Sequence, residues 1–222
     1  MTQNNYKNKQ LLIFDMDGTI LNTLNDLMDA TNYALKQNNF PLRNYEQIRK
    51  AVGNGVAMLI KRSLPNNIDE ITYKKVLKDF EEYYSAHSSE KTTTYEGMSN
   101  TLKYLKDHGY LLAVATNKLE EVAIELVDRF YPNLFSTVCG DNGIRAKKPA
   151  PDCINEIANR LNVIDKAKIV YIGDSEVDYQ TSLNSGVDCI IVSYGYRTKE
   201  ELKKLSIDTL TIDKPNQLIE YI

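Results

Sequence analysis

Short apolar runs alternate with helix-length amphipathic segments over most of this chain. Such runs predict buried strands, and strands separated by helices predict a parallel sheet covered on both faces. An apolar run at residues 11–15 is expected to join this sheet from far upstream. From about residue 97 the alternation predicts, in order, a helix near 97–108, strand Leu111–Thr116, a helix near 119–130, strand Ser136–Cys139, a helix near 151–161, strand Ile169–Ile172, a helix near 175–185 and strand Val187–Val192.

The segment from about residue 21 to 90 contains no comparable apolar strand. Its apolar residues recur at near-helical spacing from Leu24 to Leu35, and further helical patterns run through Ile48–Leu64 and Ile71–Tyr84. We therefore expect an α/β fold with a doubly wound, Rossmann-like parallel sheet core, formed by residues 1–20 and 91–222. A helical cap domain, residues 21–90, is expected to be inserted after the first strand. Open parallel sheets bind ligands at the carboxyl ends of their strands, so this cap is expected to serve as a lid.

Composition narrows the class of protein. A chain of 222 residues fits one or two domains, and 27 basic against 30 acidic residues give a formal net charge of −3. This balance argues against nucleic acid as the main partner, because a nucleic-acid surface is strongly basic. The three cysteines are widely spaced, and the polar residues 1–10 contain neither a signal-peptide core nor a membrane-length segment. We expect a cytoplasmic protein that does not bind membranes.

The first candidate site follows the first predicted strand. The run Leu11–Phe14 leads directly into Asp15, Asp17 and Gly18. Two acids crowded at the end of a buried strand require a metal ion or a proton to be tolerated. The alternative is that both acids only end the strand and open a turn, where Asp and Gly are common.

Two further segments carry polar groups at predicted strand–helix junctions. Thr116 and Asn117 follow an apolar strand, where a hydroxyl and backbone amides could hold phosphate oxygens, although either residue could simply cap the helix. Lys147 and Lys148 precede a predicted helix with a proline in its first turn, where positive charge opposes the helix dipole. A lysine directed at the strand ends could neutralise Asp15 and a bound phosphate together.

A third segment, Val170–Asp178, again leads an apolar strand into glycine and acid. Asp174 and Asp178 are four residues apart, which places them on one helix face, where they could share a cation. Acids in a first helical turn also complement the helix dipole, which is the alternative explanation for Asp178. Oxygen ligands without a His or Cys cluster favour Mg²⁺ over Zn²⁺.

These motifs together resemble those of the haloacid dehalogenase superfamily. The sequence Asp15-x-Asp17-Gly18-Thr19 resembles its nucleophile motif, Lys148-Pro149-x-Pro151 its lysine motif, and Gly173-Asp174-Ser175-x-x-Asp178 that of the phosphoglycolate phosphatase-like branch. The resemblance implies a Mg²⁺-dependent phosphatase that hydrolyses a small, phosphoglycolate-like phosphate monoester through an aspartyl-phosphate intermediate. The resemblance implies that the protein binds a small phosphorylated metabolite. It also implies a monomer or a homodimer.

The resemblance also implies roles for individual residues. Asp15 would be the nucleophile, Asp17 the general acid and base, and Lys148 and Thr116 further catalytic groups. The implied metal-binding set is Asp15, Asp17 through its backbone carbonyl, Asp174, and Asp178 in support. The expected substrate-binding residues are Gly18, Thr116, Asn117 and Lys148. In the helical segment, Asn54 lies between two glycines and could present backbone amides to a small anionic substrate, although a plain interhelical turn is the alternative.

Other functions remain open at this point. A pyrophosphatase or nucleotidase of the same family fits the same motifs, as does a β-phosphoglucomutase-like sugar phosphomutase. Outside enzymes, a phospho-receiver module or a binding scaffold also carries an aspartate at the end of a parallel strand.

Overall fold

The computed structural model describes residues 6–205 and 207–222, which form two compact units. Unit 1 comprises the chain up to Leu21 and from Thr94 onwards, and unit 2 is Asn22–Thr93. Residues 1–5 of the predicted core lie outside the described residues.

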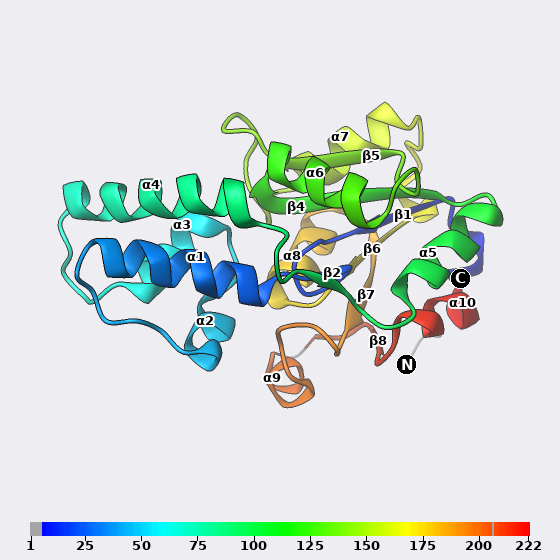
Figure 1. The fold of residues 1–222 in the computed structure, drawn as a ribbon. Coiled ribbons are helices and arrows are strands. Elements are labelled where there is room, and N and C mark those ends of the chain that lie inside the picture. The colour runs from blue at the N-terminus through cyan, green and yellow to red at the C-terminus, as the bar shows by residue number, and fades with distance from the viewer. Residues whose placement is uncertain (1–5, 206) are drawn as a thin grey trace. The chain divides into compact units, whose positions relative to one another are not determined.

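Unit 1 is built on a six-stranded sheet in the order β5-β4-β1-β6-β7-β8 (Figure 1). Every pair of neighbouring strands is parallel. The α/β class with a parallel sheet is therefore confirmed. The strands are β1 Leu11–Phe14, β4 Leu111–Leu119, β5 Thr137–Asp141, β6 Ile169–Gly173, β7 Asp188–Val192 and β8 Leu210–Ile212.

The helices of unit 1 pack against this sheet. Helices α6 and α7 contact β4 and β5, and α8 contacts β6 and β7. Ile154 and Ile157 of α7 lie in one buried cluster with Ile13 and Tyr171 of the sheet. The helical elements are η1 Tyr6–Asn8, α5 Met98–Asp107, α6 Glu120–Phe130, α7 Asp152–Arg160, η2 Lys166–Lys168, α8 Glu176–Ser185, α9 Lys199–Lys204, η3 Pro215–Gln217 and α10 Leu218–Tyr221.

The register of the central strands brings their carboxyl ends together. All four residues of β1 are buried, as the apolar run predicts for a strand covered on both faces. Phe14 is paired with Val114 of β4 and with Ile172 of β6. The polar residues that come shortly after Phe14, Val114 and Ile172 therefore lie close together at one edge of the sheet.

Strand β4 is longer than the sequence predicts. It continues past Thr116 to Leu119, so Thr116 and Asn117 do not lie at the start of the following helix. Its pairing with β5 shifts register between Ala115 and Leu119. A register shift of this kind redirects the side chains that follow it, which matters for Lys118 below.

Unit 2 is helical. Its longest helices, α1 and α4, pack along each other, and the predicted Ile48–Leu64 pattern is interrupted between α2 and α3. The chain passes between the units through two short paired strands, β2 and β3. None of the helices in the described part of the chain is both long and apolar enough to cross a membrane. The elements are β2 Leu21–Asn22, α1 Leu24–Gln37, α2 Tyr45–Ala51, α3 Val56–Ser63, α4 Glu70–His87 and β3 Thr93–Thr94.

A buried carboxylate fastens the end of unit 2 to its first helix. Asp26 of α1 is 3% exposed and accepts hydrogen bonds from the backbone N–H of Lys91 (2.9 Å) and of Thr92 (2.8 Å), and from the Thr92 hydroxyl (2.7 Å). Asp26→Ala would leave these donors without their acceptor, so we expect a loss of about 2–4 kcal/mol in the free energy of unfolding. Urea denaturation followed by circular dichroism measures it.

Asp29→Ala is the matched control for that prediction. Asp29 lies on the same helix and forms an ion pair with the Lys91 side chain, but the two side chains keep 34% and 55% exposure. Exposed ion pairs contribute little, so we expect a change below about 1 kcal/mol. Equal losses for the two variants would contradict the role given to the buried hydrogen bonds.

Candidate active site

A buried lysine lies at the carboxyl edge of the central strands. Lys148 is 5% exposed, and its Nζ atom is 2.8 Å from Oδ1 of Asp15 and 2.8 Å from Oδ1 of Asp178. Asp15 directly follows β1, and its N–H donates to the carbonyl of Ile172 in β6. The lysine and the two acids, far apart in the sequence, therefore meet at the edge where the strand register brings the chain together.

A tyrosine hydroxyl completes this arrangement, and sequence reasoning did not identify it. Tyr171 of β6 accepts a hydrogen bond from Lys148 Nζ at 2.8 Å, and its hydroxyl lies 3.0 Å from the carbonyl oxygen of Ala115 and from Oδ1 of Asp178. In the sequence Tyr171 reads as one more apolar strand residue, so no signal distinguishes it from the core.

The acids of the site outnumber the cation that faces them. Burial raises the pKa of Asp15 from its ordinary 3.8 to about 7, although Lys148 opposes the shift. Burial, with repulsion from Asp178 and Asp15, raises the pKa of Asp174 well above its usual range. Burial also disfavours ionised Asp178, but Lys148 and the hydrogen bonds from Ser175 and Tyr171 hold its pKa below the ordinary value. Lys148 thus pairs directly with two of these three buried carboxyls, Asp15 and Asp178.

The donor set fits a hard divalent cation. One oxygen each from Asp15, Asp174 and Asp178 lies within 4.8 Å of the others. Oδ1 of Asp15 faces Lys148, and Oδ2 of Asp174 accepts from the N–H of Tyr196 at 2.6 Å. Within the described residues this leaves the other oxygen of each for a cation, and oxygen-only ligands suit Mg²⁺.

Asp178 is placed differently from the other two acids. Its Oδ1 faces Lys148 and Tyr171, and its Oδ2 accepts from the N–H groups of Asp174 (3.2 Å) and Ser175 (3.1 Å) and from the Ser175 hydroxyl (2.7 Å). With both oxygens engaged, Asp178 orients Lys148 and caps the start of helix α8. This geometry favours the supporting role over direct metal ligation.

Gly18 allows two segments to approach closely. Its φ is +86°, a conformation that side chains disfavour, and a Cβ atom there would lie 2.3 Å from Oδ2 of Asp174. Its N–H donates to the carbonyl of Leu21. The glycine therefore keeps Asp174 close to the turn that follows Asp15.

The loop that carries Lys148 is fixed by hydrogen bonds to its backbone. Asn117 Oδ1 accepts from the N–H of Lys148 at 2.7 Å, and Asn117 Nδ2 donates to the carbonyl of Lys148 at 3.0 Å. Asn184 Nδ2 donates to the carbonyl of Pro149 at 2.8 Å. Asn117, which the sequence predicts to be a substrate-binding residue, thus uses its side chain to hold the Lys148 backbone.

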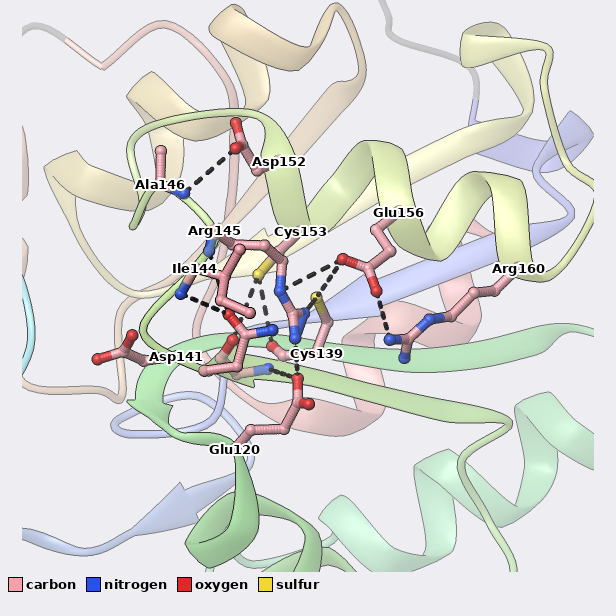
Figure 2. Close-up of polar contacts among 12 residues, drawn as sticks. Glu120, Cys139, Asp141, Ile144, Arg145, Ala146, Asp152, Cys153, Glu156 and Arg160 are labelled. Carbon is pink, nitrogen blue, oxygen red and sulfur yellow. Dashed lines mark hydrogen bonds and ion pairs between the residues drawn. The ribbon is translucent and has the colours of Figure 1, made fainter.

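Arg145 anchors the same loop from its other side. Figure 2 shows its guanidinium among Glu120 of α6, Glu156 of α7 and the sulfur of Cys139 in β5. The N–H of Ala146 donates to Oδ1 of Asp152 at 3.2 Å, and Lys147 pairs with Asp141 at 2.6 Å (Nζ to Oδ2). Lys147 therefore belongs to the supporting network, whereas Lys148 enters the site.

The end of β4 contributes the remaining groups. Thr116 is buried, and its hydroxyl accepts from the N–H of Lys118 at 3.2 Å. The Lys118 side chain is 2% exposed, and its Nζ lies 3.1 Å from Oδ1 of Asp17, whose side chain is 19% exposed. The sequence analysis did not single out Lys118, because the predicted strand ends at Thr116 and leaves Lys118 outside it.

Asn54 lies in unit 2, whereas the other candidate site residues belong to unit 1. It adopts a φ of 65° between Gly53 and Gly55, and its Oδ1 accepts a hydrogen bond from Arg62 at 3.1 Å. The structure thus brings together Asp15, Asp174, Asp178 and Lys148, pairs Asp17 with Lys118, and places Thr116 and Asn117 on the neighbouring strand.

Known proteins resemble this chain over nearly its whole length. The model of the haloacid dehalogenase-like hydrolase family matches residues 12–192. A phosphoglycolate phosphatase of Psychrobacter arcticus is 34% identical over 223 residues, covering 96% of each chain, and one of Pseudomonas fluorescens is 31% identical over 95% of this chain and 78% of its own. A solved structure of a candidate phosphoglycolate phosphatase from Lactobacillus delbrueckii subsp. bulgaricus is 34% identical, with a TM-score of 0.88 over 95% of this chain and 97% of that one.

Proposed function

The chain belongs to the haloacid dehalogenase-like hydrolases, and on that premise we propose that this phosphoric monoester hydrolase is Mg²⁺-dependent and acts on a small ester such as phosphoglycolate. The observation that carries the proposal is the position of Asp15, which faces the Lys148 ammonium at 2.8 Å within a group of buried acids. A buried carboxylate beside a cation can meet an anionic substrate without prohibitive repulsion.

In the first step a carboxylate oxygen of Asp15 attacks phosphorus, and the bond from phosphorus to the ester oxygen breaks. Asp17 protonates the departing oxygen, because an alkoxide is a poor leaving group at neutral pH. The product on the enzyme is an aspartyl phosphate. In the second step Asp17 takes a proton from water, which attacks phosphorus, releases inorganic phosphate and regenerates Asp15.

Lys148 offsets negative charge on both the nucleophile and the phosphoryl oxygens. Its two hydrogen-bonded partners, Tyr171 and Asp178, hold the ammonium in place. Asp15 and Asp174 through carboxylates, and Asp17 through its backbone carbonyl, would hold Mg²⁺, with Asp178 in support. When bound, the ion would supply further neutralisation of the phosphoryl charge.

Substrate binding is assigned to groups around this centre. The Thr116 hydroxyl and the backbone at Gly18 and Asn117 are proposed to bind phosphate oxygens, as peptide N–H groups commonly do. Asn54 of unit 2 is proposed as a further substrate-binding residue. The proposed location is the cytoplasm, which fits the three free cysteines, and the protein is proposed to be a monomer or homodimer.

A panel of phosphorylated metabolites tests the function. It contains phosphoglycolate, pyrophosphate, nucleoside monophosphates and sugar phosphates, ranked by kcat/KM in the presence of Mg²⁺. We expect phosphoglycolate to rank first. A higher value for pyrophosphate or a nucleotide would replace the proposed substrate, and conversion of a sugar phosphate to its isomer without phosphate release would indicate a mutase.

Metal removal gives a second expected result. Excess EDTA should abolish phosphate release from p-nitrophenyl phosphate, and added Mg²⁺ should restore it, because the buried acids of the site need a counter-charge. Phosphate release is measured by a colorimetric assay. Full activity after exhaustive chelation would contradict the proposed metal dependence.

A further inference from the structure

Lys118 combines deep burial with a position at the site. Its side chain is 2% exposed, and the register shift in β4 places its Nζ 3.1 Å from Oδ1 of Asp17. An ammonium group loses much hydration free energy when it is buried, so it is tolerated only with a compensating carboxylate or similar partner. The pairing with Asp17 supplies that compensation.

The two side chains of this ion pair differ in their exposure to solvent. Asp17 retains 19% exposure and can reach solvent or a ligand, whereas Lys118 is enclosed by protein. Asp17 lies in the segment after β1, where its backbone bridges to Leu21 and its short side chain could adopt several rotamers. Contact with a fixed cation selects one of them, and holding one carboxylate oxygen fixes the direction in which the other faces.

We propose that Lys118 is the positioning residue for Asp17, holding the carboxyl group where it can exchange a proton with the departing ester oxygen. The inference rests on the function proposed above, in which Asp17 is the general acid. Proton transfer requires hydrogen-bond reach, and a displacement of about 1 Å can cost about 10²-fold in rate. Lys118 acts through Asp17 and does not itself touch the reacting atoms.

The test is the dependence of kcat/KM on the leaving group. p-Nitrophenolate departs readily without a proton, whereas the alkoxide of β-glycerol phosphate needs one. For Lys118→Met we expect a loss of about 10²-fold in kcat/KM with β-glycerol phosphate, against less than about 10-fold with p-nitrophenyl phosphate. The inhibition constant of inorganic phosphate should change by less than about threefold, because phosphate binding does not need Asp17.

The ratio of the two rates is measured on one sample, so it does not depend on the fraction of folded protein. Lys118→Gln provides a second variant should Lys118→Met fail to fold. Lys103→Met is the matched control, because it removes an exposed ammonium that pairs with Asp107 on α5. The control should leave all rates unchanged.

A double-mutant cycle separates positioning from other roles. If Lys118 acts through Asp17, adding Lys118→Met to Asp17→Asn should cause little further loss with the alkyl ester. Independent, multiplicative losses would overturn the inference.

Each of the other possible outcomes would assign a different role to Lys118. Equal losses with both esters and weaker phosphate inhibition would make Lys118 a phosphate ligand. Phosphoglycolate is assayed beside the two esters, and a loss seen only with phosphoglycolate would make Lys118 a ligand of the substrate carboxylate. Unchanged rates would leave the ion pair a purely structural one. If the wild-type protein hydrolyses none of the esters, the proposed function fails, which is a different result from each of these.

Discussion

Asp15→Asn is expected to abolish phosphatase activity while preserving the fold. The amide oxygen is a far weaker nucleophile than a carboxylate, so no aspartyl phosphate can form at a useful rate. Loss of a covalent nucleophile commonly costs on the order of 10⁶-fold in kcat. Because the side chain keeps its shape, the hydrogen bond from the Asp15 N–H to the carbonyl of Ile172 is unaffected.

The stability of this variant follows from the raised pKa of Asp15. Burial moves that pKa from 3.8 to about 7, so the folded state binds a proton more tightly than the unfolded state does. The contribution of Asp15 to stability therefore falls as the pH rises from about 4 to about 7. At pH 8 the wild-type protein carries a charge that folding disfavours, and asparagine removes it. We expect a melting temperature at pH 8 no lower than that of the wild type.

Steady-state phosphate release tests the expected loss of activity, and differential scanning fluorimetry tests the expected melting temperature, on the same preparations. Asp107→Asn is the matched control, since Asp107 is an exposed carboxylate on α5 that pairs with the exposed Lys103. It should retain full activity. Substantial turnover by Asp15→Asn, verified by mass spectrometry to contain asparagine, would mean that another group attacks phosphorus.

The site residues at strand ends could be predicted from the sequence. An apolar run that stops at a polar residue indicates a strand and also locates its carboxyl end. In a parallel sheet those edges coincide, so Asp15 and Asp174 were expected to lie together. The structure agrees with this geometry, since both carboxylates contribute to one cluster. No information beyond local pattern and sheet topology is needed for that step.

Residues whose roles depend on distant partners could not be anticipated. Lys118 faces Asp17 only because β4 continues past Thr116 and shifts register against β5, which is a property of strand pairing. Tyr171 looks like an ordinary buried strand residue until Lys148 is placed beside its hydroxyl. Local sequence shows neither the register of the strand pairing nor the contact between Asn117 and a backbone 31 residues away.

Asp17→Asn is expected to be the second most damaging change. An amide can neither donate the proton needed by an alkoxide leaving group nor accept one from water, so both chemical steps are affected. General acid–base catalysis typically contributes about 10²–10⁴-fold, and we expect kcat/KM for an alkyl phosphate to fall by about that factor. The change also removes the carboxylate from beside the buried Lys118, so all rates should be measured well below the variant's melting temperature.

The two steps can be separated with p-nitrophenyl phosphate, whose leaving group needs no proton. In Asp17→Asn the first step should then proceed, whereas hydrolysis of the aspartyl phosphate lacks its base. Rapid-quench experiments should show a burst of p-nitrophenolate, and intact mass spectrometry should find one phosphoryl group retained on the protein. Asp15→Asn should show neither signal, which makes it the control. A near-normal rate with alkyl esters would assign the proton donor to another residue, whereas a variant without burst or adduct would place the main contribution of Asp17 before the chemical steps.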